Sequence, residues 1–213
     1  MKTLIAIPAM DMMHTPFVNS LLGLRRVGDV GVSITVSTLI HDARNKLAKQ
    51  AVDEGYDRML WLDSDMIFQP DLMERLSADL DEGREFVTGV YYKRKAPFTP
   101  TIYSDVGLYN DGLKIYPDAT IYEDYPRDDI FKIQACGFGA VMHTTDILKR
   151  VGAQLGPPFG MVPGFGEDIS FCMRCAELGI EMYADSRIKL GHLAMFPVDE
   201  DFARVVKEQK GET

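Results

Sequence analysis

The amino-acid sequence predicts an α/β protein built from βαβ units around a parallel sheet. Three observations support this fold class. Short apolar runs of strand length alternate with longer segments that carry apolar residues at helical spacing. Gly or Pro stands at many of the boundaries between these segments. The 213 residues are 46% hydrophobic and 26% charged, which suits one domain with a sizeable core.

The first 92 residues contain strands and helices in alternation. The first strand ends at Pro8, the second helix is closed by Gly55, and the third helix begins at Pro70. The expected strands are 3–8, 32–36, 58–62 and 86–92, and the expected helices are 16–27, 42–54 and 70–80.

The pattern changes after residue 92. Residues 93–130 contain several prolines and the turn sequence Asn110-Asp111-Gly112, which predicts a hairpin-rich insert at the edge of the sheet. A Gly- and Pro-rich loop at 152–166 is expected to be exposed and functional. The other expected elements are a strand at 131–143, helices at 145–151 and 167–178, strands at 180–184 and 188–192, and a polar tail from 200 that is either helical or frayed.

Composition and charge exclude several classes of protein. The net charge of −9, without a Lys/Arg-rich run, disfavours binding to unmodified duplex nucleic acid. No window approaches the ~20 apolar residues that cross a bilayer, so no integral membrane segment is expected. The N-terminal MKTLIAIPAM reads as a buried strand instead of a signal peptide, and an odd count of three cysteines fits a reducing compartment. The expected location is the cytoplasm.

Two carboxylates follow the apolar strand 58–62. Asp63 and Asp65 are separated only by Ser64, and they stand at the carboxyl end of a strand, where open α/β sheets bind ligands. Carboxylates this close repel each other unless a cation lies between them. A hard divalent ion would accept their oxygens and keep positions for phosphate oxygens. A solvated turn is the alternative interpretation.

Four sequence elements together resemble a known family. They are LWLDSDM at 60–66, GFGEDISFCMR at 164–174, Gly191-His192 after an apolar strand, and Ala43-Arg44-Asn45 before the first motif. Their order and spacing resemble the GT-A glycosyltransferases, and within them the family 2-like enzymes. The resemblance implies a Rossmann-like three-layer α/β/α fold with a mixed, mostly parallel sheet.

The resemblance also implies a domain organisation. Residues 1–195 would form a single catalytic domain, and 196–213 a C-terminal tail. Within the domain, 1–92 would bind the nucleotide-sugar, 93–130 would be the insert, and 131–195 would form the acceptor and catalytic half.

By the same resemblance, the donor site binds a nucleotide-sugar, expected to be a UDP-sugar, together with Mn²⁺ or Mg²⁺. Asp65 and His192 would bind the metal. Asp63 would bind it too, or contact the ribose and uracil of the donor. Further donor-binding residues implied are Pro8 and Ala9 beside the base, Arg44 at the nucleotide or its phosphates, and Ser64.

Asp168 is the residue expected to act as general base. It would accept the proton of an acceptor hydroxyl as that oxygen attacks the anomeric carbon, with inversion of configuration. Glu167 would orient the acceptor. A retaining mechanism is the alternative, because some GT-A enzymes retain configuration with a similar Glu-Asp pair. The acceptor is open among a glycan, a lipid-linked sugar, a protein and a modified base, and the oligomeric state is not predicted.

Several of these residues also have purely structural interpretations. Glu167 and Asp168 are favoured in a first helical turn by the helix dipole. Arg44 could lie on a helix surface, and the basic cluster at 91–95 could be either a solvated strand end or a site for phosphate or acceptor. The competing functions are a catalytically inactive nucleotide- or sugar-binding relative, a haloacid dehalogenase-type phosphatase and a sugar nucleotidyltransferase. The last two lack their expected N-terminal motifs here.

Overall fold

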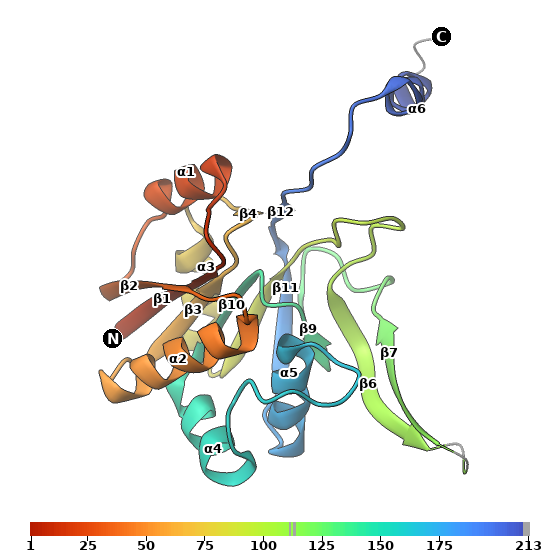
Figure 1. Ribbon diagram of the computed structural model, residues 1–213. Helices are drawn as coiled ribbons and strands as arrows, with labels where there is room; N and C mark the ends of the chain where they lie inside the picture. The colour runs from red at the N-terminus through yellow and green to blue at the C-terminus, as the bar shows by residue number, and fades with distance from the viewer. Residues whose placement is uncertain (111, 113, 211–213) are drawn as a thin grey trace.

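A mixed β-sheet forms the centre of the molecule. The computed structural model describes residues 1–110, 112 and 114–210. Within these residues the main sheet has seven strands in the order β2-β1-β3-β10-β5-β11-β8 (Figure 1). They are β1 (Lys2–Ala9), β2 (Asp29–Val36), β3 (Arg58–Leu62), β5 (Phe86–Val90), β8 (Ile130–Ile133), β10 (Ala140–Thr144) and β11 (Met182–Lys189).

Strand direction follows the expected βαβ pattern on one side of the sheet. β1 pairs in parallel with both β2 and β3, and β11 pairs in parallel with β5. β10 lies antiparallel between β3 and β5, and β8 is antiparallel to β11. Of these described strands, five therefore run in one direction. The mixed, mostly parallel sheet is confirmed.

Helices cover both faces of this sheet and create two hydrophobic cores. Leu4 and Ala6 of β1 belong to the core that also contains α2, α4 and α5 residues. Ile5 and Ile7 belong to the opposite core, with α1 and α3 residues. This alternation is the period-2 pattern of a strand buried on both faces. The helices are α1 (Thr15–Gly23), α2 (Ile40–Asp53), α3 (Leu72–Asp81), α4 (Thr145–Leu155) and α5 (Glu167–Glu177).

The predicted insert forms a second, smaller sheet. β6 (Ile102–Asn110) and β7 (Ile115–Ile121) pair antiparallel as the expected hairpin, and β9 (Ala135–Cys136) pairs with β6 (Figure 1). The expected turn residue Asp111 lies outside the described residues.

Two strand predictions are wrong. The segment 131–143 is not one strand but β8, β9 and β10, which belong to two sheets. After β8 the chain leaves the main sheet and pairs with β6 of the insert through β9, and next to β9 the Gly137 N–H donates to Thr101 O at 2.8 Å. The second error concerns 180–184 and 188–192. These positions form one strand, β11, followed by the two-residue β12 (Gly191–His192).

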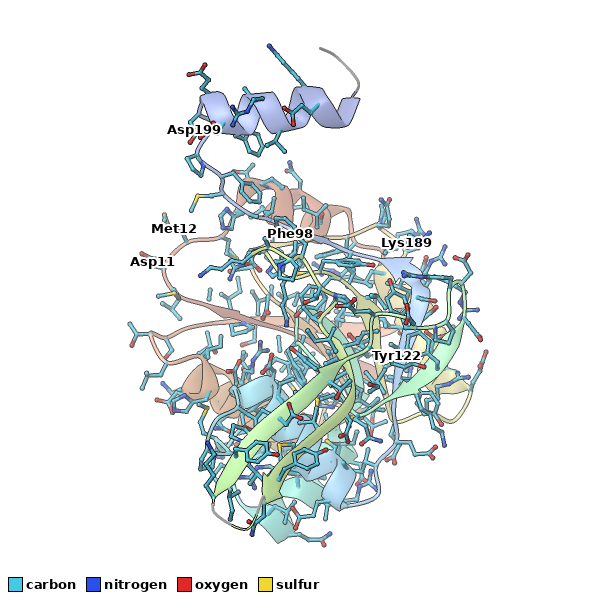
Figure 2. All side chains as sticks on the ribbon, turned by 90° about the vertical axis from the view of Figure 1, so that its right-hand side faces the viewer. Asp11, Met12, Phe98, Tyr122, Lys189 and Asp199 are labelled. Atoms are coloured by element: carbon cyan, nitrogen blue, oxygen red, sulfur yellow. The ribbon has the colours of Figure 1, made fainter. Side chains whose placement is uncertain are left out.

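The C-terminal helix α6 (Glu200–Lys210) stands clear of the body at the end of an extended segment (Figures 1 and 2). The predicted tail is thus helical over its described part, and residues 211–213 lie outside the described residues. Among the described helices, none has both the length and the apolar character needed to span a bilayer.

Candidate active site

The predicted site residues meet in one cavity of about 680 Å³. It lies where β1 and β3 end and α5 begins, at the carboxyl edge of the parallel strands. The cavity lining includes every predicted site residue, namely Pro8, Ala9, Arg44, Asp63, Ser64, Asp65, Glu167, Asp168 and His192. Their shared location is established, and their individual roles remain predictions.

A pair of very short strands brings Asp65 to His192. After β3, the chain forms β4 (Met66–Ile67), which pairs antiparallel with β12, so that Met66 is opposite His192. The backbone N–H of Leu193 donates to the carbonyl of Asp65 at 2.9 Å. As a result His192 Nε2 lies 3.5 Å from Asp65 Oδ2.

The ring of His192 is held in a defined orientation. Its Nδ1 lies 2.8 Å from the carbonyl oxygen of Tyr92. Because a carbonyl can only accept, Nδ1 must carry the proton, which leaves Nε2 facing Asp65. The Tyr91 ring packs edge-on against the imidazole at 5.1 Å between centroids. A backbone carbonyl on the second ring nitrogen is the usual support of a metal-binding histidine.

Tyr91 reaches His192 because two glycines leave room for it. A Cβ at Gly137 would lie 2.2 Å from the Tyr91 hydroxyl, and one at Gly139 would lie 2.8 Å from its ring. The Gly139 N–H also donates to this hydroxyl at 3.1 Å. The two glycines of the Gly137-Phe138-Gly139 segment therefore leave space for the Tyr91 ring next to His192.

Asp65 and His192 fit the protein share of a divalent metal site. Within the described part of the chain, no three His, Cys, Asp or Glu side chains converge as a metal-binding group. An ion at this pair would therefore take further ligands from phosphate oxygens and water, as Mg²⁺ commonly does. Arg94 Nη1 forms an ion pair with Asp65 at 2.6 Å, so a cation already faces this carboxylate. Burial alone would raise the pKa of Asp65, but His192 and Arg94 outweigh it and lower the pKa.

Arg44 links the two halves of the site. Its Nη2 lies 2.8 Å from Asp63, and its Nε lies 3.1 Å from Glu167, which is 123 positions away in the sequence. The side chain is only 2% exposed. Its guanidinium also lies 5.1 Å from the Phe138 ring centroid and 5.4 Å from that of Trp61. Arg44 thus neutralises two carboxylates of the site, and its predicted contact with donor phosphates stays a prediction.

Asp168 lies in the first turn of α5 and lines the cavity. Its Oδ1 accepts the backbone N–H of Ile169 at 2.8 Å. Burial, followed by the charge of Glu167, raises the pKa of Asp168 to about 6. A carboxylate with a pKa near neutrality can take up a proton more readily than an ordinary aspartate, which is what a general base requires.

A second cavity of about 430 Å³ adjoins the first. Both cavities are lined by Arg94, Asp168 and His192, so these three side chains lie at their common boundary. The other residues of the second cavity are Tyr91, Lys93, Lys95, Thr101, Tyr103 and Gly137.

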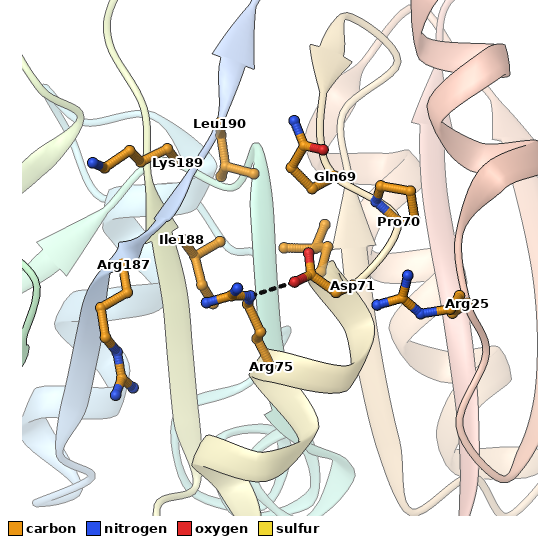
Figure 3. Close-up of a pocket in the computed structure, with 10 residues that line it drawn as sticks. Arg25, Gln69, Pro70, Asp71, Arg75, Arg187, Ile188, Lys189 and Leu190 are labelled. Carbon is orange, nitrogen blue, oxygen red and sulfur yellow. Dashed lines mark hydrogen bonds and ion pairs between the residues drawn. The ribbon is translucent and has the colours of Figure 1, made fainter.

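A cavity of about 510 Å³ near α3 and β11 contains none of the predicted site residues (Figure 3). Arginine and lysine side chains surround it, but each has an acidic partner. The pairs are Arg25 with Glu74, Arg75 with Asp71, Arg187 with Asp79 and Asp185, and Lys189 with Asp128. Among the described residues that line this cavity, every Arg and Lys is therefore paired, and none offers a free positive charge to an anion.

Sequence reasoning missed two contributions to the site. Tyr91 and Arg94 belong to the basic cluster at 91–95, which from the sequence could be either part of the site or a solvated strand end. Tyr91 packs on His192, and Arg94 pairs with Asp65. The glycines at 137 and 139 were the available signal, because close approach of a large side chain is one reason for paired glycines.

Comparisons with known proteins show the fold. No family model matches the sequence, and no curated protein matches it. Among solved structures, A197 from STIV is similar with a TM-score of 0.63 and 19% identity, over 91% of this chain and 86% of that one. GalNAc-T7, a glycosyltransferase solved with UDP, GalNAc and Mn²⁺, has a TM-score of 0.60 and 9% identity. That match covers 92% of this chain and 43% of GalNAc-T7, so the chain spans less than half of that protein. The architecture of this chain is that of the GT-A glycosyltransferases.

Proposed function

We propose that this protein is a metal-dependent glycosyltransferase that moves a sugar from a nucleotide-diphosphate sugar, expected to be a UDP-sugar, to an acceptor hydroxyl. The observation that supports the proposal most is the meeting of Asp65, His192 and Asp168 in one cavity at the edge of a GT-A-type sheet. GalNAc-T7, whose fold is similar, was solved with UDP and Mn²⁺.

In the proposed reaction, Pro8 and Ala9 border the nucleotide base, and Asp65 and His192 would hold a divalent metal ion. A bound Mn²⁺ or Mg²⁺ would stabilise the negative charge that develops on the diphosphate as the glycosidic bond breaks. Arg44 keeps Asp63 and Glu167 in position. Asp168 takes the proton of the acceptor hydroxyl as its oxygen attacks the anomeric carbon. A single displacement of this kind inverts the configuration.

Calorimetric titration tests the donor site. UDP, GDP and other nucleotides are titrated with Mn²⁺ and with EDTA, first into the native protein and then into Asp65→Ala. We expect binding of one nucleoside diphosphate that requires Mn²⁺ and falls by roughly 100-fold or more in the variant. Asp53→Ala, an exposed carboxylate of α2, is the control and should bind normally. Absence of nucleotide binding under every condition would reject the proposal.

A further inference from the structure

The two adjoining cavities differ in charge. The first cavity, of about 680 Å³, is the one in which the proposed donor would bind, and we call it the donor cavity. It is lined by five acidic residues and by two arginines, and one of these, Arg44, is neutralised by its carboxylate partners. The second cavity has three consecutive cations, Lys93, Arg94 and Lys95, and its lining contains one carboxylate, Asp168. In a chain with a net charge of −9, such a local excess of positive charge marks a place for an anionic group.

The cations are held by a closed turn. The N–H of Lys93 donates to Thr99 O, and the N–H of Phe98 donates to Lys95 O, both at 2.9 Å. The ring of Phe98 packs against Phe196, on the segment that leads to α6, at 6.2 Å between centroids. The backbone of this turn is thus fixed at both ends, which fixes where its side chains emerge.

Two of the three cations are available to a ligand. Arg94 is already paired with Asp65. Lys93 Nζ lies 5.6 Å from the Tyr103 ring centroid, and Lys95 is exposed. Neither lysine takes part in an ion pair within the described residues. Tyr103 adds an aromatic face beside them.

The position of Asp168 assigns this cavity to the acceptor. An in-line displacement needs the attacking oxygen on the side of the anomeric carbon opposite the leaving diphosphate. Asp168 is at the boundary of the two cavities, so an acceptor in the second cavity can place its hydroxyl against this base while the donor fills the first.

We infer, on the basis of the function proposed above, that the second cavity binds the acceptor and selects one that carries a phosphate monoester close to the reacting hydroxyl. Lys93 and Lys95 pair with the phosphate, and Tyr103 packs against the ring or chain that bears it.

The test uses the full chain saturated with UDP and Mn²⁺. UDP is titrated first, and phenyl phosphate and phenol are then titrated into the loaded protein as a charged probe and its neutral counterpart. We expect phenyl phosphate to bind at least roughly tenfold more tightly than phenol, with an affinity that falls as NaCl is added. The double variant Lys93→Gln/Lys95→Gln should lose roughly tenfold in phenyl phosphate affinity. Lys149→Gln, an exposed lysine of α4, should lose none.

The outcomes separate the two proposals. Failure of UDP, GDP and the other nucleotides to bind under every condition rejects the glycosyltransferase function and, with it, the acceptor cavity. Normal UDP binding with equal affinity for phenol and phenyl phosphate rejects only the selection of a phosphate. Phenyl phosphate that binds only when UDP is absent occupies the donor cavity and also rejects the inference.

Parallel sedimentation with phosphatidylcholine vesicles, with and without phosphatidic acid, distinguishes a lipid source of the phosphate from a soluble one. The salt dependence in native protein serves as a second readout if the double variant does not fold.

Discussion

Two buried clusters in this molecule each combine one arginine with two carboxylates, yet they bury opposite charges. In the site cluster, Arg44 is 2% exposed, while the side chains of Asp63 and Glu167 are 29% and 14% exposed and line the cavity of about 680 Å³. In the second cluster, formed by residues of α3 and β11, Asp79 and Asp185 are 5% and 2% exposed, and Arg187 is 45% exposed.

Because one cluster buries the arginine and the other buries the carboxylates, the two clusters compensate their buried charge in different ways. Arg44 is always ionised, so it neutralises its partners from inside and leaves their outer faces for a ligand. In the second cluster the carboxylates are deeper than the cation. Burial, followed by the charge of Asp185, raises the pKa of Asp79 to about 7, although Arg187 opposes the shift. The site cluster therefore keeps carboxylate oxygens open toward the cavity, whereas the second cluster takes up a proton on Asp79.

The largest expected effect concerns Asp168, which adjoins the site cluster. Asp168→Asn keeps the size of the side chain but removes its basicity, so kcat should fall by roughly 10²–10⁴-fold while UDP still binds. Steady-state kinetics with the donor and acceptor that the titrations identify measure this change.

Asp146→Asn is the matched control, because Asp146 occupies the same position in α4 as Asp168 does in α5. It should retain native kcat. An active Asp168→Asn variant would show that this carboxylate is not the base and would favour the retaining alternative.

Replacing the arginine of each cluster should lower the free energy of unfolding by different amounts. Arg44→Met leaves two partly buried carboxylates without a partner and should cost about 3–5 kcal/mol in the free energy of unfolding. Arg187→Met should cost about 1 kcal/mol or less, because Arg187 is half exposed and Asp79 can take up a proton. Urea denaturation at pH 7 compares the two variants. Equal losses would contradict the distinction between the clusters.

The pH dependence of the reaction should follow the protonation of Asp168, beside the site cluster. Because the base acts only when deprotonated and the pKa of Asp168 is about 6, kcat should fall about tenfold per pH unit below 6 and level off above it. Stopped assays from pH 4.5 to pH 8 (about two units on either side of the expected midpoint) measure the profile. UDP titrations across the same range show whether binding changes instead. A flat profile down to pH 5 would be inconsistent with Asp168 as the base.

The stability contributed by the second cluster should also depend on pH. A folded-state pKa of about 7, against an ordinary value of 3.8, means that the folded protein holds a proton on Asp79 that the unfolded chain releases. Stability should therefore fall as the pH rises from 4 to 7 and stay constant above that range. Asp79→Asn removes the charge and should raise the free energy of unfolding by about 1–2 kcal/mol at pH 8, with a smaller increase at pH 5.

Asp53→Asn, on the exposed surface of α2, provides the comparison for that measurement. It should change stability by less than about 0.5 kcal/mol at either pH. A destabilised Asp79→Asn variant at pH 8 would show that the second cluster keeps both carboxylates ionised.

The local elements of the site could be predicted from the sequence to a useful extent. The strand before Asp63 and the helix that starts at Glu167 are where the periodicity and the glycines predicted them. The prediction of a single strand at 131–143 was wrong, because an apolar run does not show where a chain changes sheets.

What the sequence by itself determined is the alternation of strands and helices and the chemistry at their ends. Apolar periodicity, turn residues and strand-end carboxylates act over a few residues, so they can be read directly. Only the tertiary structure decided that β4 pairs with β12 and brings His192 to Asp65, and that Arg44 joins Asp63 to Glu167. Those contacts join segments more than a hundred residues apart, and they depend on which strand ends meet at one edge of the folded sheet.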